Sequence, residues 1–263
     1  MKKIRSFKIF CNDNEKSIST SEIVKKKLLK NGLIESDEYE LAIAVGGDGS
    51  FLRMVKQTNF NSDTLYVGIN AGTLGFAQDI TLSDLDDFIN DINEGNYKVD
   101  TIGVQKTKVI TSSGIYNFYS LNEIVIRDKD LNTLVLDILI DNAFLEEYHG
   151  DGILIATSFG STAYNLSFGG SIIYNTFHTL QITPIAPLNN KSYRSLLNSV
   201  VLPEEKIIKV IPKTKNLLIT IDGENKLYDE VDYIETSVKD KRIKCLRGSY
   251  YDFSIKINEK FLK

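Results

Sequence analysis

The sequence contains few cysteines and no excess of basic residues. Only 2 cysteines occur among its 263 residues, and Cys11 and Cys245 lie far apart, each in an expected strand. One disulfide would be compatible with this count, but we expect two reduced, buried thiols of a cytoplasmic protein. The net charge of −4 argues against general nucleic-acid binding, which requires a basic surface.

The sequence also lacks a recognisable targeting or membrane-spanning segment. Its basic start, Met1-Lys2-Lys3, is followed by polar residues at 6, 8, 12 and 13, which interrupt the apolar segment of a secretory signal. No apolar run approaches the roughly 18 residues that a membrane helix needs. We therefore expect a cytoplasmic protein that binds neither membrane nor nucleic acid.

The first hundred residues alternate between apolar strands and helical patterns. We expect strands at 7–11, 41–45 and 65–70, and helices at about 21–30, from 50 onward and at 83–94. Ser19, Thr20 and Ser21 are the candidates for the N-cap of the first helix. Nearly continuous apolar strands separated by helices indicate a parallel sheet that is covered on both faces.

After residue 97 the pattern changes to short, β-branched strands bounded by turn residues. These are expected at 104–111, 115–126, 133–140, 153–157, 180–185, 206–211, 217–221 and 241–246. Because no long helix separates them, they predict an antiparallel β-sandwich. The expected organisation is an α/β domain at 1–99, a β-sandwich domain at 100–251, and a last strand or helix at 252–263 that returns to the first domain.

The residues that follow the expected strand 41–45 are Gly46-Gly47-Asp48-Gly49. Ligands of open parallel sheets bind beyond the carboxyl ends of the strands, where glycines let the backbone approach phosphate oxygens. A plain strand–helix turn usually needs only one glycine. The P-loop, the G-x-G-x-x-G fingerprint and the protein-kinase signatures are missing. A carboxylate inside a phosphate-binding turn is suited to accept a proton from an attacking hydroxyl, or to help hold a divalent metal.

Two further stretches carry polar groups suited to a ligand. His149-Gly150-Asp151-Gly152 precedes an expected strand, which leads into a run of small and hydroxyl residues from Gly160 onward. Hydroxyls mixed with a tyrosine suit an aromatic base and a sugar. The pair Asn122-Glu123 lies in an apolar stretch, where a buried carboxylate would need a partner such as a ligand hydroxyl. A structural turn explains that pair about as well.

Taken in order, these stretches resemble the motifs of the NAD kinase family in its compact bacterial form. They are Gly46-Gly47-Asp48-Gly49, Asn122-Glu123, Gly150-Asp151-Gly152 and Gly160-Ser161-Thr162-Ala163-Tyr164. The first motif is shared with lipid kinases and phosphofructokinases, whereas the ordered set is specific. The resemblance covers nearly the whole chain. It implies that ATP phosphorylates the adenosine 2′-hydroxyl of NAD to give NADP, with a divalent cation, most simply Mg²⁺.

The resemblance also implies roles for individual residues. Asp48 matches the proton acceptor, and the backbone of Gly46, Gly47 and Gly49, with Arg53, would bind phosphate. The remaining matches to substrate-binding positions are Gly49, Asn122, Glu123, His149, Asp151, Thr162, Ala163, Tyr164, Asn165, Leu166, Ser167, Ala186 and Glu224. His149 and Asp151 match positions that contact the dinucleotide partly from a neighbouring subunit, which implies a homodimer or homotetramer.

The sequence departs from the family pattern at three places. Ser158-Phe159 stands where relatives usually have proline and a small hydroxyl residue, and Ser171 stands where proline is common. His149 occupies a position where arginine is frequent, so a fixed charge becomes a titratable one. A lipid or sugar kinase with the same glycine turn and a non-catalytic dinucleotide sensor are the alternative functions.

Overall fold

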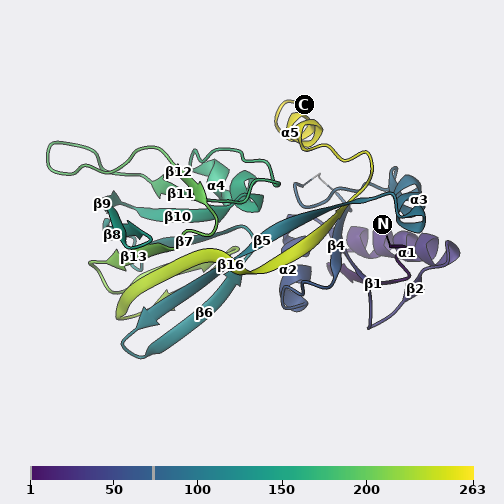
Figure 1. The fold of residues 1–263 in the computed structure, drawn as a ribbon, viewed down its shortest axis with the longest axis horizontal. Coiled ribbons are helices and arrows are strands. Elements are labelled where there is room, and N and C mark those ends of the chain that lie inside the picture. The colour runs from purple at the N-terminus through teal and green to yellow at the C-terminus, as the bar shows by residue number, and fades with distance from the viewer. Residues whose placement is uncertain (1, 73–74) are drawn as a thin grey trace. The chain divides into compact units, whose positions relative to one another are not determined.

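The computed structural model describes residues 2–72 and 75–263 and divides into two compact units (Figure 1). The first unit comprises Met1–Ile102 and Arg242–Lys263, and the second comprises Gly103–Lys241. Two long strands, β5 (Lys98–Thr111) and β16 (Val231–Arg247), carry the chain between them. No helix of the described residues combines the length and the apolar character needed to cross a membrane.

The first unit is built on a parallel sheet with the strand order β2-β1-β3-β4-β16. Its strands are β1 (Ser6–Cys11), β2 (Ile34–Glu35), β3 (Leu41–Gly46), β4 (Leu65–Asn70) and the end of β16, and its helices are α1 (Glu15–Lys30), α2 (Asp48–Gln57), α3 (Leu85–Glu94) and α5 (Phe253–Phe261). Every residue of β3 is buried, as expected for a strand covered on both faces. Helices α1 and α3 share one core with the sheet, and α2 packs against β3 and β4.

Helix α1 begins six residues earlier than the sequence pattern predicts. Asn14, which we assigned to a polar turn, is its N-cap, and the Asn14 side chain accepts a hydrogen bond of 2.8 Å from the Ser17 backbone N–H. Ser19, Thr20 and Ser21 therefore lie inside the helix, and the N-cap prediction is wrong. The reason is that asparagine is as good an N-cap as serine or threonine, so Asn14 can satisfy the free N–H groups of the first turn and start the helix before Ser19.

The second unit is an antiparallel β-sandwich. One sheet has the order β12-β11-β10-β7-β14-β15, and the other contains β16, β13, β8 and β9, with β5 pairing to β16 and β6. The bounds are β6 (Gly114–Ser120), β7 (Glu123–Asp128), β8 (Leu134–Ile140), β9 (Ala143–Gly150), β10 (Gly152–Thr157), β11 (Thr179–Ile185), β12 (Val200–Pro203), β13 (Ile208–Pro212), β14 (Leu217–Ile221) and β15 (Glu224–Tyr228), with the short helices η1 (Phe159–Thr162) and α4 (Tyr164–Ser167). Side chains of both sheets, such as Ile126 and Leu136, form one buried core.

The structure corrects three details of the predicted second domain. The expected strand 115–126 is two strands, because β6 and β7 pair with different partners and the chain bends between them at Leu121-Asn122. The expected strand 241–246 is the end of β16, which pairs in parallel with β4 of the first unit. Residues 242–251 accordingly belong to the first unit rather than to the second.

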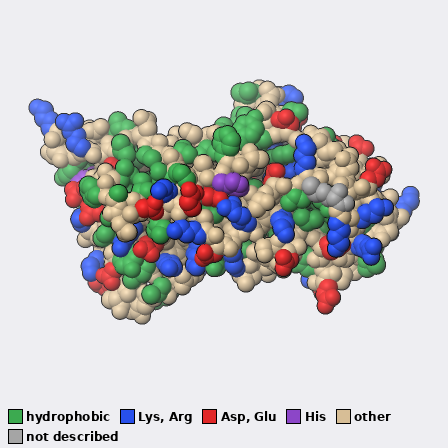
Figure 2. Space-filling view, in the orientation of Figure 1, with side chains coloured by type: hydrophobic (Ala, Val, Ile, Leu, Met, Phe, Trp, Pro, Cys, Tyr) green, Lys and Arg blue, Asp and Glu red, His purple; other side chains and the backbone are tan. Residues whose placement is uncertain are grey.

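The two cysteines are free thiols that differ in exposure. Cys245 is buried in β16, whereas Cys11 is exposed at the end of β1. The prediction of unpaired thiols is confirmed, but the prediction of burial holds only for Cys245. On the face seen in Figure 2, acidic and basic side chains are intermingled.

Candidate active site

The turn between β3 and α2 contains glycines with different structural requirements. Gly46 has φ +148°, and a Cβ there would lie 2.3 Å from Ser50 Oγ, so the backbone conformation and the packing both require glycine. At Gly47 and Gly49, by contrast, a Cβ would have no described atom within 4 Å. Packing within the described chain therefore does not require glycine at these two positions, which leaves close approach of a ligand as a reason for it.

Asp48 is the first residue of α2, where a carboxylate interacts favourably with the helix dipole. Its side chain points to a neighbouring loop: Oδ2 accepts a hydrogen bond of 3.1 Å from the Phe76 backbone N–H, and Oδ1 accepts one of 2.8 Å from the Ala77 N–H. A Cβ at Gly75 would lie 2.1 Å from Oδ1. The loop therefore fixes the carboxylate by direct hydrogen bonds and by close packing.

Arg53, expected to bind phosphate, extends from α2 with an exposed side chain. Its guanidinium donates a hydrogen bond to Asn12 Oδ1, which also accepts a hydrogen bond of 2.8 Å from Ser50 Oγ. Asn12 follows β1 and lies beside the glycine turn, so it is a member of this site that the sequence analysis does not identify. Its only signal in the sequence is its place after an apolar strand.

In the second unit, Asn122 and Glu123 are fixed by the carboxylate of Asp222. The Asp222 oxygens accept hydrogen bonds of 2.7, 2.8 and 3.2 Å from the backbone N–H groups of Leu121, Asn122 and Glu123. Asn122 lies in the bend before β7 and is half-buried, whereas Glu123 opens β7 and is buried. Asp222 is not predicted as a site residue from the sequence, because its partners are about a hundred positions away.

Glu123 is 6% exposed, and among the described residues its Oε2 has no hydrogen-bond partner. Burial, and next the negative charge of Asp222, raise the pKa of Glu123 to about 8, although the backbone N–H of Tyr164 acts in the opposite direction. Glu123 is therefore largely protonated at pH 7. A protonated carboxyl group can donate one hydrogen bond and accept another, which suits a ligand hydroxyl.

The run from Gly160 to Ser167 packs directly against Asn122. A Cβ at Gly160 would lie 2.2 Å from the Asn122 carbonyl oxygen, so only glycine permits this approach. Tyr164 is partly exposed, and its hydroxyl lies 3.3 Å from Arg127 Nη2. Thr162, Ala163 and Leu166 are half-buried and Ser167 is exposed, so these four predicted positions reach the surface. The structure thus brings the 160–167 run together with Asn122 and Glu123.

Asn165 differs from its neighbours because its side chain makes its hydrogen bonds inside the protein. Its amide nitrogen donates to the Ser161 carbonyl at 3.1 Å and to Gln181 Oε1 at 3.0 Å, and its oxygen accepts a hydrogen bond of 2.6 Å from Thr183 Oγ1. Asn165 is completely buried. These contacts give Asn165 the role of fixing the loop on β11.

His149, Asp151 and Ala186 form a separate group at the other end of β10. Asp151 immediately precedes β10, whereas Thr157, its last residue, hydrogen-bonds to Leu121 and Asn122. With a rise of about 3.3 Å per residue, the two ends of this strand are roughly 17 Å apart. Within one chain, His149 and Asp151 therefore do not join Glu123. The His149 ring lies 4.2 Å from the ring of Tyr193, and its Nε2 is 3.0 Å from Glu147.

Glu224 is exposed and begins β15, after the hairpin turn at Asp222-Gly223. Both turn residues have positive φ, +45° and +85°, as a two-residue hairpin requires. This hairpin is not predicted from the sequence, because β15 is mostly polar.

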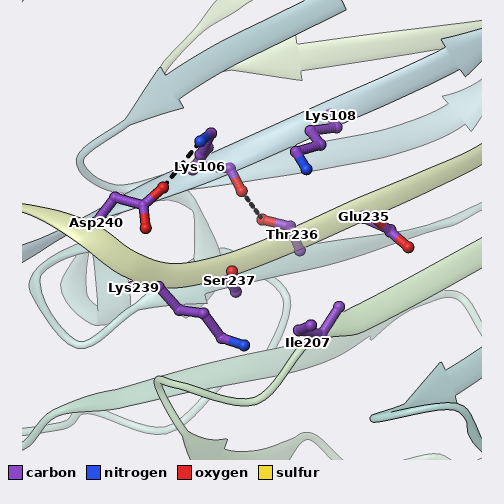
Figure 3. Close-up of a pocket in the computed structure, with 8 residues that line it drawn as sticks. All are labelled: Lys106, Lys108, Ile207, Glu235, Thr236, Ser237, Lys239 and Asp240. Carbon is purple, nitrogen blue, oxygen red and sulfur yellow. Dashed lines mark hydrogen bonds and ion pairs between the residues drawn. The ribbon is translucent and has the colours of Figure 1, made fainter. Parts of the chain in front are cut away.

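A hollow of about 200 Å³ in the second unit is lined by none of the predicted residues, so far as the structure describes it. Figure 3 shows the charged side chains Lys106, Lys108, Lys239, Glu235 and Asp240 around it. Lys106 Nζ pairs with Asp240 at 2.8 Å. Acidic and basic groups are thus mixed in this hollow, and it contributes nothing to the site described above.

Both parts of the chain match domains of one protein family. Residues 11–97 match the ATP-NAD kinase N-terminal domain, and residues 121–247 match the ATP-NAD kinase C-terminal domain. The chain is 39% identical to an NAD kinase of Finegoldia magna over 97% of each sequence. It belongs to the NAD kinase family. The predictions of this family and of an ATP-dependent NAD kinase are confirmed.

Solved structures of the family show the same fold. The chain is similar to a yeast NADH kinase, determined as a complex with NADH, with a TM-score of 0.82, 20% identity, and coverage of 98% of this chain and 88% of that one. It is also similar to an NAD kinase from Archaeoglobus fulgidus in complex with ATP, with a TM-score of 0.73, 19% identity, and coverage of 93% and 94%. The predicted α/β domain followed by a β-sandwich is confirmed.

No three His, Cys, Asp or Glu side chains are grouped as a metal site within residues 2–72 and 75–263. A site made wholly of protein ligands is not what Mg²⁺ usually requires, because it is commonly held by one or two carboxylates together with substrate phosphates. Asp48 fits that arrangement as a single carboxylate beside a turn with accessible backbone.

Proposed function

We propose that this kinase transfers the γ-phosphoryl group of ATP to the 2′-hydroxyl of the adenosine ribose of NAD, giving NADP and ADP. The observation that carries this proposal is the placement of Asp48. Its carboxylate is fixed by two backbone N–H groups at the end of a parallel strand, beside glycines whose backbone is open to a ligand. The family membership supplies the substrates.

Asp48 is proposed to accept the proton of the attacking hydroxyl. As the new bond between oxygen and phosphorus forms and the bond to the ADP oxygen breaks, the hydroxyl proton becomes acidic and passes to the carboxylate. The hydrogen bonds from Phe76 and Ala77 occupy one position on each carboxylate oxygen. A carboxylate has about four lone-pair sites, so positions remain to receive the proton.

The phosphates are proposed to bind at the β3–α2 turn. Gly47 and Gly49 leave space over the backbone, and the first turn of α2 offers the positive end of its dipole. Arg53 is adjacent and already oriented by Asn12. A divalent cation, held by the phosphates and Asp48, would neutralise phosphate charge.

Asn122 and Glu123 are proposed to bind the adenosine ribose, with the exposed residues of the 160–167 run beside them against the adenine. The buried Glu123 carboxyl group supplies a donor and an acceptor for two ribose hydroxyls. Three backbone N–H groups fixed by Asp222 keep this bend in place.

A homodimer or homotetramer is proposed because His149 and Asp151 lie at the opposite end of β10 from Glu123. In the proposed oligomer, His149 and Asp151 of one copy contact the dinucleotide bound at Glu123 of another copy, as the family resemblance implies. We expect sedimentation at micromolar concentration to show an oligomer. A fully active monomer would contradict this. The unpaired thiols of Cys11 and Cys245 support a reducing, cytoplasmic location.

The decisive experiment incubates the protein with ATP, Mg²⁺ and NAD and follows NADP with an NADP-dependent dehydrogenase. We expect NADP formation by the wild type, and a loss of turnover of about 10²–10⁴-fold in Asp48→Asn with NAD binding retained. A dinucleotide sensor would bind NAD without forming NADP. Turnover of Asp48→Asn near that of the wild type would reject Asp48 as the proton acceptor.

A further inference from the structure

The two N–H groups that fix Asp48 belong to a loop whose position depends on the C-terminal helix. Phe76 and Ala77 lie outside regular helices and strands. The carbonyl oxygen of Phe76 accepts a hydrogen bond of 2.7 Å from Nζ of Lys256, which is on α5. The Phe76 peptide units therefore connect α5 to the Asp48 carboxylate.

Lys256 is only 6% exposed, so its place is determined by a buried ion network. Its ammonium pairs with Asp79, the Arg247 guanidinium pairs with the other oxygen of Asp79, and Arg247 Nε donates a hydrogen bond of 2.9 Å to Asp100. The side chain of Asp79 is 1% exposed. Buried charges of this kind are stable only when each keeps its partners, so the network has little freedom to rearrange.

The ring of Phe76 provides a second attachment to the same helix. Its centroid lies 5.2 Å from that of Phe261 and 6.2 Å from that of Phe253, which are residues of the last and first turns of α5. Aromatic pairs at such distances are favourable. Helix α5 therefore holds Phe76 both by its carbonyl oxygen and by its ring.

Lys256 also interacts electrostatically with Asp48. Burial and the neighbouring Arg247 lower the pKa of Lys256 well below its ordinary value, whereas the negative charge of Asp48 raises it. The side chains of Lys256 and Asp48 are therefore close enough to interact through their charges. Lys256 has two routes to Asp48, one mechanical and one electrostatic.

We propose that Lys256 is a positioning residue for the reaction: through the Phe76–Ala77 peptide it orients the Asp48 carboxylate toward the attacking hydroxyl. This inference rests on the proposed role of Asp48. Because a displacement of about 1 Å can reduce a rate by 10²-fold, losing this hold should affect turnover more than NAD affinity.

The test is a double-mutant cycle with Lys256→Met and Asp48→Asn, with kcat and the KM for NAD measured for all four proteins. We expect Lys256→Met to lower kcat about 10- to 100-fold and to change KM by less than about threefold. In the Asp48→Asn background, where no proton acceptor remains to be oriented, Lys256→Met should change the residual kcat by less than about twofold.

Lys260→Met is the matched control, since Lys260 is exposed in the last turn of the same helix, and its kcat should equal that of the wild type. If Lys256→Met does not fold, Phe261→Leu replaces it, with a smaller loss of kcat and the same non-additivity. An equal loss of kcat in both backgrounds would overturn the positioning role and leave Lys256 as a stabilising residue. Wild-type turnover of Asp48→Asn alone would instead reject the role of Asp48.

Discussion

The buried carboxyl group of Glu123 predicts an unusual dependence of stability on pH. Its pKa is raised from 4.5 to about 8, and each pKa unit corresponds to about 1.4 kcal/mol, so ionising Glu123 in the folded protein costs roughly 5 kcal/mol more than in the unfolded chain. Between these two values the folded protein keeps a proton that the unfolded chain has released. The contribution of Glu123 to stability is therefore full below pH 4.5 and is lost as pH rises through about 8.

The substitution Glu123→Gln keeps the shape of the protonated side chain and removes its ionisation. At pH 5 we expect the variant and the wild type to differ by less than about 1 kcal/mol, because Glu123 is then protonated in the folded state. At pH 9 the variant should be more stable by about 2–4 kcal/mol, since it avoids a buried charge near Asp222. Thus the difference between the two proteins should grow between about pH 4.5 and 8 and level off above that.

Urea unfolding at pH 5, 6, 7, 8 and 9 measures this difference directly. Glu205→Gln is the matched control, because Glu205 is exposed and the same chemical change there does not affect a buried carboxyl group. If Glu123→Gln followed the wild-type curve over the whole range, Glu123 would ionise as an ordinary surface carboxylate. The inference that it meets a ligand as a neutral group would then be wrong.

Three further predictions concern the catalytic turn and the two aspartates. Gly49→Ala should stabilise the protein by about 0.5–1 kcal/mol through helix propensity. Both Gly47→Ala and Gly49→Ala should raise the KM for ATP, and unchanged ATP kinetics would refute the phosphate role. Gly75→Ala places a methyl group 2.1 Å from Asp48 Oδ1 and should lower kcat by about 10²-fold, and normal turnover would show that the carboxylate orientation is unimportant. Asp151→Ala should raise the KM for NAD and leave kcat nearly unchanged, whereas Asp48→Ala should abolish turnover; rescue of Asp48→Ala alone by saturating NAD would reverse these assignments.

The sequence predicts an α/β part followed by a β-sandwich, because the hydrophobic period and the turn residues are local signals. Fully apolar stretches such as 41–45 identify the parallel sheet, and Asp48 is placed by its position between a strand and a helix. The start of α1 is missed, since asparagine and serine are both good N-caps and the pattern alone does not choose between them. The mostly polar strand β15 gives only a weak hydrophobic signal.

The hydrogen-bond partners of the site are not predictable in the same way. Phe76 is 28 residues from Asp48, and Lys256 is 180 residues from Phe76. No motif in the sequence marks Lys256, which is one of several lysines in an amphipathic segment. Its burial, which makes it informative, is a property of the folded chain alone.

Asp222 illustrates how one carboxylate can act on another. It accepts three backbone N–H groups at the bend before β7, so its charge is well stabilised and its position is fixed. Burial is the main reason why the pKa of Glu123 is raised, and the fixed negative charge of Asp222 adds to it and favours the neutral form of Glu123. Asp48 is likewise held by two backbone N–H groups, those of Phe76 and Ala77. These two environments agree with the different tasks that we propose for the two acids: Glu123 hydrogen-bonds a sugar as a neutral group, and Asp48 accepts a proton.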